Sequence, residues 1–373
     1  MLNSGRSQQL QEGDYVSLTE FPAWETNSDT LTDFQESLCR SIRCDRFKMA
    51  ANFSQFGSLS GTAKWISGVI TAGGIIYGIP YKATNVLKLD TDDDSTATFG
   101  SFSSGGDKWV GGALGTNGKI YGCPFFASTV LKIDPSNDSV STFGSLSSDT
   151  PKWAGAILAP NGFIYCLPYS ATTILKINTS EDSVGTFGSL LSGSAKWQGG
   201  VLAPNGMIYG VPLTSATVLK INTSNDSIST FGSLGSGTLK WMGGVLAPNG
   251  MIYGIPFDAT TVLKINPLTD VVTTFGSLSG SAKWHAGCLG PDGMIYAFGW
   301  RSRSILRINP TTDTATIFGT ITAPADANAY AGATLAPNGY IYGIPATATT
   351  AIKLGATMTI PTDRCASRVC NHF

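Results

Sequence analysis

One unit recurs seven times along this chain at a period close to 44 residues, and it limits the possible folds more than any other feature. Its clearest copy, residues 240–256, reads Lys-Trp-Met-Gly-Gly-Val-Leu-Ala-Pro-Asn-Gly-Met-Ile-Tyr-Gly-Ile-Pro. An aromatic anchor opens each copy, at Trp65, Trp109, Trp153, Trp197, Trp241, Trp284 and Tyr330. Successive anchors are 44, 44, 44, 44, 43 and 46 residues apart, which is typical of a repeat protein.

Each unit reads as four short strands separated by turn residues. The first strand carries Lys-Trp-x-Gly-Gly-Val-Leu, and the second carries Met-Ile-Tyr-Gly-Ile-Pro. Asn-Gly pairs such as Asn161-Gly162 lie between them, and we expect a type I′ hairpin turn there. Residues 261–265 and 271–276 are typical of the third and fourth strands. Four strands per period, without helical periodicity, predict blades of a β-propeller.

The ends of the repeat region predict how the ring closes. A Phe-Gly pair ends each fourth strand, at Phe56, Phe99, Phe143, Phe187, Phe231, Phe275 and Phe318. The first copy precedes the first Trp, and the seventh unit lacks a copy of its own after Leu354. We therefore expect residues 52–59 to pair with the last blade, which removes two open sheet edges. The prediction is an all-β, seven-bladed propeller of four-stranded blades over residues 52–360.

Two segments flank the predicted propeller. In residues 1–51, Leu31, Phe34, Leu38 and Ile42 have helical spacing, so we expect an amphipathic helix near residues 30–47. The sequence has no apolar run long enough to span a membrane, and residues 1–21 lack the apolar core of a signal peptide. These features favour a soluble, cytoplasmic protein. An internal start at Met49 is an open alternative, so residues 1–48 need not belong to the mature chain.

Four of the seven cysteines lie in two matching stretches, the second of which forms the tail at residues 361–373; the four are Cys39, Cys44, Cys365 and Cys370. Ring closure would bring these stretches towards one another. Three interpretations remain open: reduced surface thiols, disulfides that tie the termini, and a four-thiolate zinc site. Cys123, Cys166 and Cys288 fall within predicted strands, where we expect buried, inert thiols.

Charge and composition narrow the classes of partner. Lys and Arg number 24 against 25 Asp and Glu, so no strongly basic field would attract nucleic acid. The chain holds only two histidines, His285 and His372, and we find no clustered metal ligands and no glycine-rich phosphate loop. We therefore predict no cofactor and no metal, and a protein or carbohydrate as the ligand.

The repeat unit resembles a known group of propellers. Its pattern Gly-x-Leu-Ala-Pro-Asn-Gly-x-Ile-Tyr-Gly-Ile-Pro recurs over about residues 52–360. In this it is similar to repetitive seven-bladed propellers of the streptogramin-lyase, NHL-like and kelch-like neighbourhood. The resemblance implies the propeller fold. Propellers of that neighbourhood include lyases, lactonases, sugar binders and protein scaffolds, so the resemblance leaves the function open.

Propeller topology would gather the repeated Lys-Trp pairs on one face. Loops that lead into first strands share a face with loops that join second to third strands, and this puts six pairs together: Lys64 and Trp65, Lys108 and Trp109, Lys152 and Trp153, Lys196 and Trp197, Lys240 and Trp241, Lys283 and Trp284. The opposite face collects Asp92, Asp93, Asp94, Asp138, Asp182, Asp226, Asp270 and Asp313, so we expect an electrically polarised ring. Either the pairs bind ligand, or each Trp packs between blades while the Lys ammonium stays in water.

The sixth unit departs most from the repeat. It carries His285, and it replaces the residues after Ile-Pro with Trp300, Arg301 and Arg303, which suggests an anion or substrate site or else ordinary drift of a repeat. Catalysis needs unlike groups that converge, whereas near-identical blades supply like groups. We therefore predict a non-catalytic binding or scaffold protein that recognises a carbohydrate, acidic ligand or protein through its Lys/Trp face. The alternative is a lyase- or lactonase-type enzyme at the channel mouth near blade six.

Overall fold

A computed structural model describes residues 52–148, 150–235, 237, 239–322 and 328–355. Within these ranges the chain forms strands β1 to β28 and contains no helix. No segment of the described ranges is a helix long and apolar enough to cross a membrane. The helix expected near residues 30–47 lies outside the described residues, as do Cys39, Cys44, Cys365 and Cys370.

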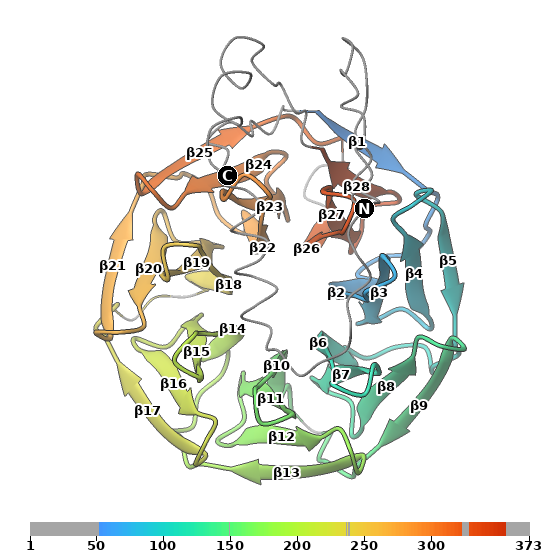
Figure 1. Ribbon diagram of the computed structural model, residues 1–373, viewed down its shortest axis with the longest axis horizontal. Coiled ribbons are helices and arrows are strands. Elements are labelled where there is room, and N and C mark those ends of the chain that lie inside the picture. Colours follow the sequence, from blue (N-terminus) through green and yellow to red (C-terminus); the bar gives the residue numbers. More distant parts are fainter. Residues whose placement is uncertain (1–51, 149, 236, 238, 323–327, 356–373) are drawn as a thin grey trace, which may run out of the picture.

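Seven four-stranded antiparallel sheets surround a central axis as blades (Figure 1). Blade one contains β2 (Trp65–Ile70), β3 (Ile75–Pro80), β4 (Val86–Asp90) and β5 (Thr96–Phe99). Blade two contains β6 (Trp109–Leu114), β7 (Ile120–Pro124), β8 (Val130–Asp134) and β9 (Ser139–Phe143). Blade three contains β10 (Trp153–Leu158), β11 (Phe163–Pro168), β12 (Ile174–Asn178) and β13 (Ser183–Phe187).

The remaining four blades follow the same order. Blade four contains β14 (Trp197–Leu202), β15 (Met207–Pro212), β16 (Val218–Asn222) and β17 (Ser227–Phe231). Blade five contains β18 (Trp241–Leu246), β19 (Ile252–Pro256), β20 (Val262–Asn266) and β21 (Val271–Phe275). Blade six contains β22 (Trp284–Leu289), β23 (Ile295–Gly299), β24 (Ile305–Asn309) and β25 (Thr314–Phe318). Blade seven contains β26 (Tyr330–Leu335), β27 (Ile341–Pro345), β28 (Ala351–Leu354) and β1 (Phe53–Phe56).

The ring closes as the displaced Phe-Gly copy predicts. Strand β1 pairs antiparallel with β28, in a register that runs from Phe53 opposite Leu354 to Phe56 opposite Ala351. Figure 1 shows β1 at the perimeter beside β28, where it completes the last blade. The first segment of the repeat region therefore holds the two ends of the ring together.

The turns between first and second strands differ from the expected type I′ form. In the turn at residues 159–163 only Gly162 has a positive φ, of +81°. The Gly162 N–H donates to the Ala159 carbonyl at 3.0 Å, and the Ala159 N–H donates to the Phe163 carbonyl at 2.9 Å. This is the longer hairpin turn that ends in a left-handed glycine. Asn161 acts through its side-chain amide, which donates to Tyr165 Oη at 2.8 Å and to the Thr223 carbonyl of the next blade at 2.6 Å.

The inner strands approach one another too closely for side chains at one level of the axis. A register shift between Trp109 and Gly112 marks a bulge at Gly111, which has a φ of +84°. A Cβ on Gly111 would lie 2.8 Å from Gly155 Cα in the next blade. Glycine is therefore required here by both backbone conformation and space.

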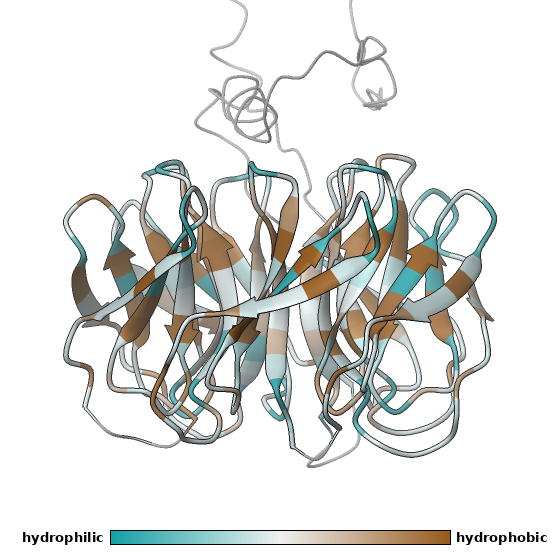
Figure 2. Cartoon of the chain, turned by 90° about the horizontal axis from the view of Figure 1, so that it is seen from below, coloured by the Kyte–Doolittle hydropathy of each residue, from teal (hydrophilic) through white to brown (hydrophobic). Residues whose placement is uncertain are grey.

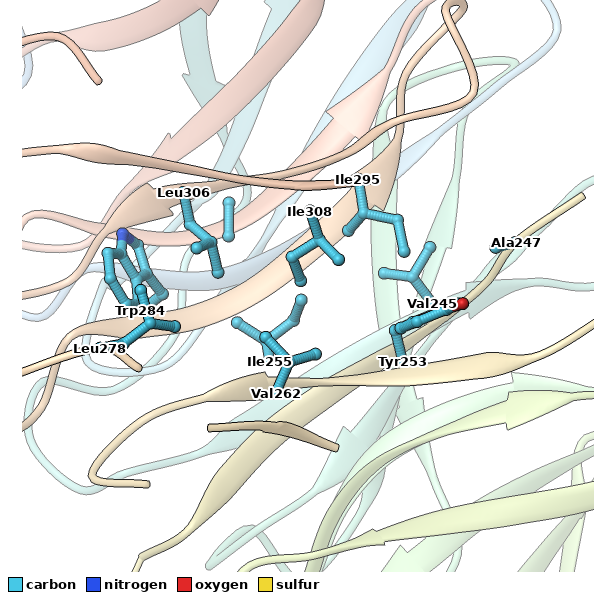
Figure 3. Packing of buried hydrophobic residues seen from close by; sticks show 11 residues of the cluster. Val245, Ala247, Tyr253, Ile255, Val262, Leu278, Trp284, Ile295, Leu306 and Ile308 are labelled. Atoms are coloured by element: carbon cyan, nitrogen blue, oxygen red, sulfur yellow. The ribbon is translucent and has the colours of Figure 1, made fainter. Parts of the chain in front are cut away.

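Buried side chains of neighbouring blades form one core cluster at each junction. Figure 3 shows the junction between blades five and six, where Ile255 and Val262 face Ile308 and Leu306. The side view shows apolar residues concentrated along the strands and polar residues in the loops at both rims (Figure 2). The second strand of each blade also contributes a buried Tyr, so the junctions resemble one another.

Candidate functional site

The anchor tryptophans pack between blades. All six are between 2 and 4% exposed. Trp109 belongs to a core cluster that includes Ile79 and Val86 of blade one, so its indole fills the junction between blades one and two. Each indole N–H donates to a backbone carbonyl of its own blade, as from Trp241 Nε1 to the Thr261 carbonyl at 2.7 Å. The aromatic half of the Lys/Trp motif is thus structural.

The repeated lysines are buried as well, which corrects the expectation that their ammonium groups stay in water. Lys64, Lys108, Lys152, Lys196, Lys240 and Lys283 are 3 to 8% exposed. Lys64 Nζ donates to the Ala348 carbonyl of blade seven at 2.8 Å and to the Gly61 carbonyl at 3.1 Å. Lys240 Nζ donates to the Thr214 and Ser215 carbonyls of blade four at 3.2 and 2.9 Å. Lys64 and Lys240 thus join loops of neighbouring blades, and backbone carbonyl oxygens replace water around the ammonium group.

Burial changes the protonation of this ring of lysines. Removal from water disfavours the ammonium form and lowers the pKa of Lys64 to about 8. The same cause lowers the pKa of Lys196 and Lys240. Lys64 Nζ also lies 5.6 Å from the centre of the Trp65 ring, which favours the charged form.

The rim opposite the Lys-Trp pairs carries the expected aspartates, and six of the eight form ion pairs with lysines, so the predicted acidic face is partly neutralised. Lys220 of blade four meets Asp270 of blade five at 2.7 Å, and Lys264 meets Asp313 at 2.5 Å. Ion pairs of the same kind join Lys88 to Asp138, Lys132 to Asp182, Lys176 to Asp226 and Lys353 to Asp94. The hydrogen bond to Asp270 raises the pKa of Lys220.

A groove in blade one lies on the rim that carries the six Lys-Trp pairs, the Lys/Trp rim. It has a volume of about 490 Å³ and lies between the segment that follows β1 and the loop from β3 to β4. Its polar lining consists of five hydroxyl side chains, one amide and two ammonium groups: Ser58, Ser60, Thr62, Thr84, Thr98, Asn85, Lys64 and Lys82. No carboxylate is among the residues that line it.

The two lysines of the blade-one groove differ in accessibility. Lys64 is held by the Gly61 carbonyl, so it fixes the groove's wall at residues 58–62. The Lys82 side chain is 49% exposed and lies 3.4 Å from an Asp107 oxygen. An exposed pair of this kind contributes little stability and exchanges readily with other charged partners. Lys82 is therefore the accessible cation of the groove.

The axis of the ring is apolar near the Lys/Trp rim. One cluster joins Ile66, Val110, Ala154 and Ala331, which come from blades one, two, three and seven. His285 and Gln198 are the polar exceptions, and their Nε2 atoms lie 3.1 Å apart. The His285 ring packs against Trp300 with ring centres 4.9 Å apart and an angle of 34° between the ring planes. Burial lowers the pKa of His285 to about 4, so the imidazole is neutral at pH 7.

In the described part of the chain, the side-chain hydrogen-bond partner of His285 is Gln198. Its Nδ1 is buried and has no hydrogen-bond partner among the described residues. Deeper along the axis a cavity of about 150 Å³ is lined by Ser67, Ala156, Ile157 and glycines of the first strands of blades two to five. These residues supply no side-chain acid or base, so the described axis does not contain an evident catalytic pair.

The structure separates the predicted site residues and adds others. The Lys-Trp pairs share one rim but lie buried at junctions, and His285 with Trp300 lies at the axis. Arg301 and Arg303 are exposed on the Lys/Trp rim beside blade six. Sequence reasoning missed Lys82 and the loop hydroxyls. The signal in the sequence was the variation at this position of the repeat. The residues that correspond to Lys82 in the other units are Phe126, Ser170, Thr214, Asp258, Arg301 and Thr347.

The fold and this rim define a seven-bladed β-propeller built from near-identical repeats. The sequence profile of a repeat of unknown function (DUF6923) matches residues 200–359, which is less than half of the chain. No curated protein matches the chain. The profile therefore recognises the repeat in three to four blades, and its description names no activity.

Solved structures agree with the fold. Streptogramin B lyase is 14% identical with a TM-score of 0.68, and the match covers 82% of this chain and 98% of that chain. Catalytically inactive virginiamycin B lyase from Staphylococcus aureus with quinupristin gives the same identity and TM-score over 82% and 99%. Hydrazine synthase of Kuenenia stuttgartiensis is 11% identical, with a TM-score of 0.61 over 81% and 98%. At such identities the likeness shows the propeller fold alone.

Proposed function

We propose that this protein is a non-catalytic binding propeller that recognises an acidic, polyhydroxylated ligand, such as an oligosaccharide with carboxylate or sulfate groups. The ligand would lie in the blade-one groove. The observation that carries the proposal is the groove's lining, which combines five hydroxyls, an amide and two ammonium groups without a carboxylate. Hydroxyl and amide side chains both donate and accept hydrogen bonds, as sugar hydroxyls do.

Each lysine of the groove has its own role in this proposal. Lys82 supplies the accessible charge, and an oxyanion of the ligand replaces Asp107 as its partner. Lys64 does not need to touch the ligand. Its bonds to the Gly61 and Ala348 carbonyls hold the groove's wall in place, so it is a positioning residue.

A second acid-binding position on the same rim is proposed at blade six. The connection into β22 has the same length and form as that into β2, with φ values of +94° at Gly280 and +99° at Gly61. Lys283 Nζ donates to the Gly280 carbonyl at 2.8 Å, just as Lys64 does to Gly61. Across from it stand the exposed Arg301 and Arg303, where blade one has Lys82 and Thr84. Guanidinium groups suit carboxylate and sulfate oxygens.

The proposal is tested by calorimetry on oligogalacturonate and on sulfated oligosaccharides, with neutral chains of equal length for comparison. We expect the full-length protein to bind the acidic chains more tightly. Lys82→Ala should weaken binding about five- to tenfold, because one charge-assisted hydrogen bond is lost. Lys119→Ala is the matched control, since Lys119 pairs with Asp134 on the opposite rim. Equal affinity for neutral chains, or equal loss in both variants, contradicts the proposal.

The enzyme alternative rests on one observation, the buried Nδ1 of His285 without a partner among the described residues. A lyase- or lactonase-type reaction at the axis would convert its substrate, whereas the binding proposal predicts that the oligosaccharides are recovered intact after prolonged incubation. Chromatography of the recovered chains decides between them. Products that are lost in His285→Ala, while Lys82→Ala still forms them, would favour the enzyme.

A further inference from the structure

The second strands contain a small residue whose position faces the preceding blade. It is Gly78, Gly122, Gly210, Gly254 and Gly343 in five blades, Ala297 in blade six and Cys166 in blade three. A Cβ on Gly254 would lie 3.4 Å from Val211 Cγ1 of blade four, and one on Gly210 would lie 3.4 Å from Leu167 Cδ1 of blade three. In these two cases the small residue packs against the second strand of the preceding blade. Its neighbour there is the aliphatic residue that directly follows that blade's own small position.

Blades two and three break this pattern on both sides of their junction. Cys166 of β11 occupies the small position, and its counterpart in β7 is Cys123. The other blades carry larger side chains at the Cys123 position, namely Ile79, Leu167, Val211, Ile255, Phe298 and Ile344. At this junction Cys166 is larger than the glycine of five other blades, and Cys123 is smaller than the residues at its position in the other blades. Both cysteines are fully buried in one core cluster, as free thiols in contact with each other.

We propose that Cys123 and Cys166 are an oxidation site that forms a disulfide between blades two and three. The repeat supplies the geometry. Because Val211 Cγ1 is one bond of about 1.5 Å from its Cβ, a Cβ at Gly254 would be within about 5 Å of Val211 Cβ. Disulfides need Cβ atoms about 3.5 to 4.5 Å apart, so the equivalent Cys pair needs only a small approach. Figure 1 shows β7 and β11 in these adjacent blades.

The oxidant is a low-molecular-weight disulfide such as oxidised glutathione. The Cys123 thiolate attacks one glutathione sulfur, the glutathione disulfide bond breaks, and one glutathione thiolate leaves. The Cys166 thiolate then attacks Cys123 Sγ and releases the second glutathione, so two protein thiols are oxidised and one small disulfide is reduced. The two protons lost by the protein thiols are taken up by the two glutathione thiolates.

We expect the thiol–disulfide exchange to occur during folding, before the two blades dock. In the folded chain burial raises the pKa of the Cys123 thiol well above its ordinary value, which suppresses the reactive thiolate. In the unfolded chain both thiols are accessible. The bond closes a 44-residue loop, one repeat in length, so it restricts the unfolded chain and is afterwards shielded from reductants.

The test is oxidative refolding of the full chain. Protein unfolded under reducing conditions is refolded with reduced and oxidised glutathione, alkylated, and mapped without reduction by mass spectrometry. We expect one peptide pair that joins Cys123 to Cys166 and a melting temperature a few degrees above that of the reduced protein. If the chain does not refold, protein synthesised in a cell-free extract buffered with oxidised glutathione is mapped in the same way.

Two variants serve as controls. Cys166→Gly restores the residue of five other blades, so it should fold, lack the linked peptides and show no redox dependence of melting. Cys288→Ala changes a cysteine of β22 in another junction and should keep the linked peptides. Complete alkylation of Cys123 and Cys166 in the oxidatively folded wild type, or pairing of either with any other cysteine, overturns the proposal.

Discussion

The two rims of the propeller both use lysine to join neighbouring blades, but in opposite ways. On the Lys/Trp rim the ammonium of Lys240 is buried and donates to two backbone carbonyls of blade four. On the opposite rim Lys220 meets the carboxylate of Asp270, and its side chain is 23% exposed. The first arrangement places a charge among neutral dipoles, and the second neutralises it in partial contact with water.

This difference indicates which rim is free to bind a ligand. The opposite rim has its repeated lysines and aspartates paired at six of the seven junctions, so these repeated charges already have partners. On the Lys/Trp rim the repeated lysines are occupied with carbonyls, while Lys82, Arg301 and Arg303 are added by single blades. A ligand would therefore be recognised by residues that depart from the repeat, and the repeated residues would support them.

The largest effect is expected at the Lys/Trp rim. Lys240→Met keeps most of the side-chain volume but leaves the Thr214 and Ser215 carbonyls without their donor. We expect a loss of about 1 to 2 kcal/mol in the free energy of unfolding, because buried unpaired carbonyls cost about that much. Denaturant titration measures it. An unchanged midpoint would mean that water replaces the ammonium and that this rim is not a fastening.

A smaller effect is expected from the same change on the opposite rim. Lys220→Met removes a partly exposed ion pair, and we expect a loss of about 0.2 to 1 kcal/mol. The loss should shrink in 1 M salt, which screens exposed charges, whereas the effect of Lys240→Met should hardly change. The comparison of the two rims fails if both variants respond alike to salt.

A third effect is expected from pH, because groups at both rims change their pKa on folding. The pKa of Lys64 is about 8 when folded and near 10.5 when unfolded, so between these values the unfolded chain binds more protons and stability rises with pH. Burial raises the pKa of Tyr121 to about 12, so above pH 10 the unfolded chain loses protons first and stability falls. The raised pKa of Lys220 adds to that fall. We expect melting temperatures to peak near pH 10, and the rise from pH 8 should diminish in Lys64→Met.

The sequence predicted the fold because the same pattern of strand and turn residues recurs in every blade. Seven anchors set the number of blades, and the displaced Phe56-Gly57 copy predicted the closing strand. The turn type was wrong because Asn161 was interpreted as a residue chosen for its backbone. Its amide instead bridges to Tyr165 and to Thr223 of the next blade, a contact 62 residues away that local pattern does not reveal.

The site was predicted less well because its side chains serve junctions between blades. Repetition marked Lys64 as a ligand contact, although its ammonium is directed to carbonyls of blades one and seven. The aspartates predicted an acidic rim because their lysine partners, such as Lys264 for Asp313, stand 49 residues earlier. Lys82 was overlooked because a single exposed lysine in a repeat has no signature until the groove around it is seen.

Hydrogen–deuterium exchange of the full-length protein, with and without a saturating acidic oligosaccharide, tests most directly whether the Lys/Trp rim is the binding rim. The account predicts that ligand slows exchange in residues 58–64 and 82–85, which form the blade-one groove. Residues 135–138, in a turn of the opposite rim, should exchange at the same rate in both samples. Protection of the opposite rim, or equal protection of both rims, would contradict the account.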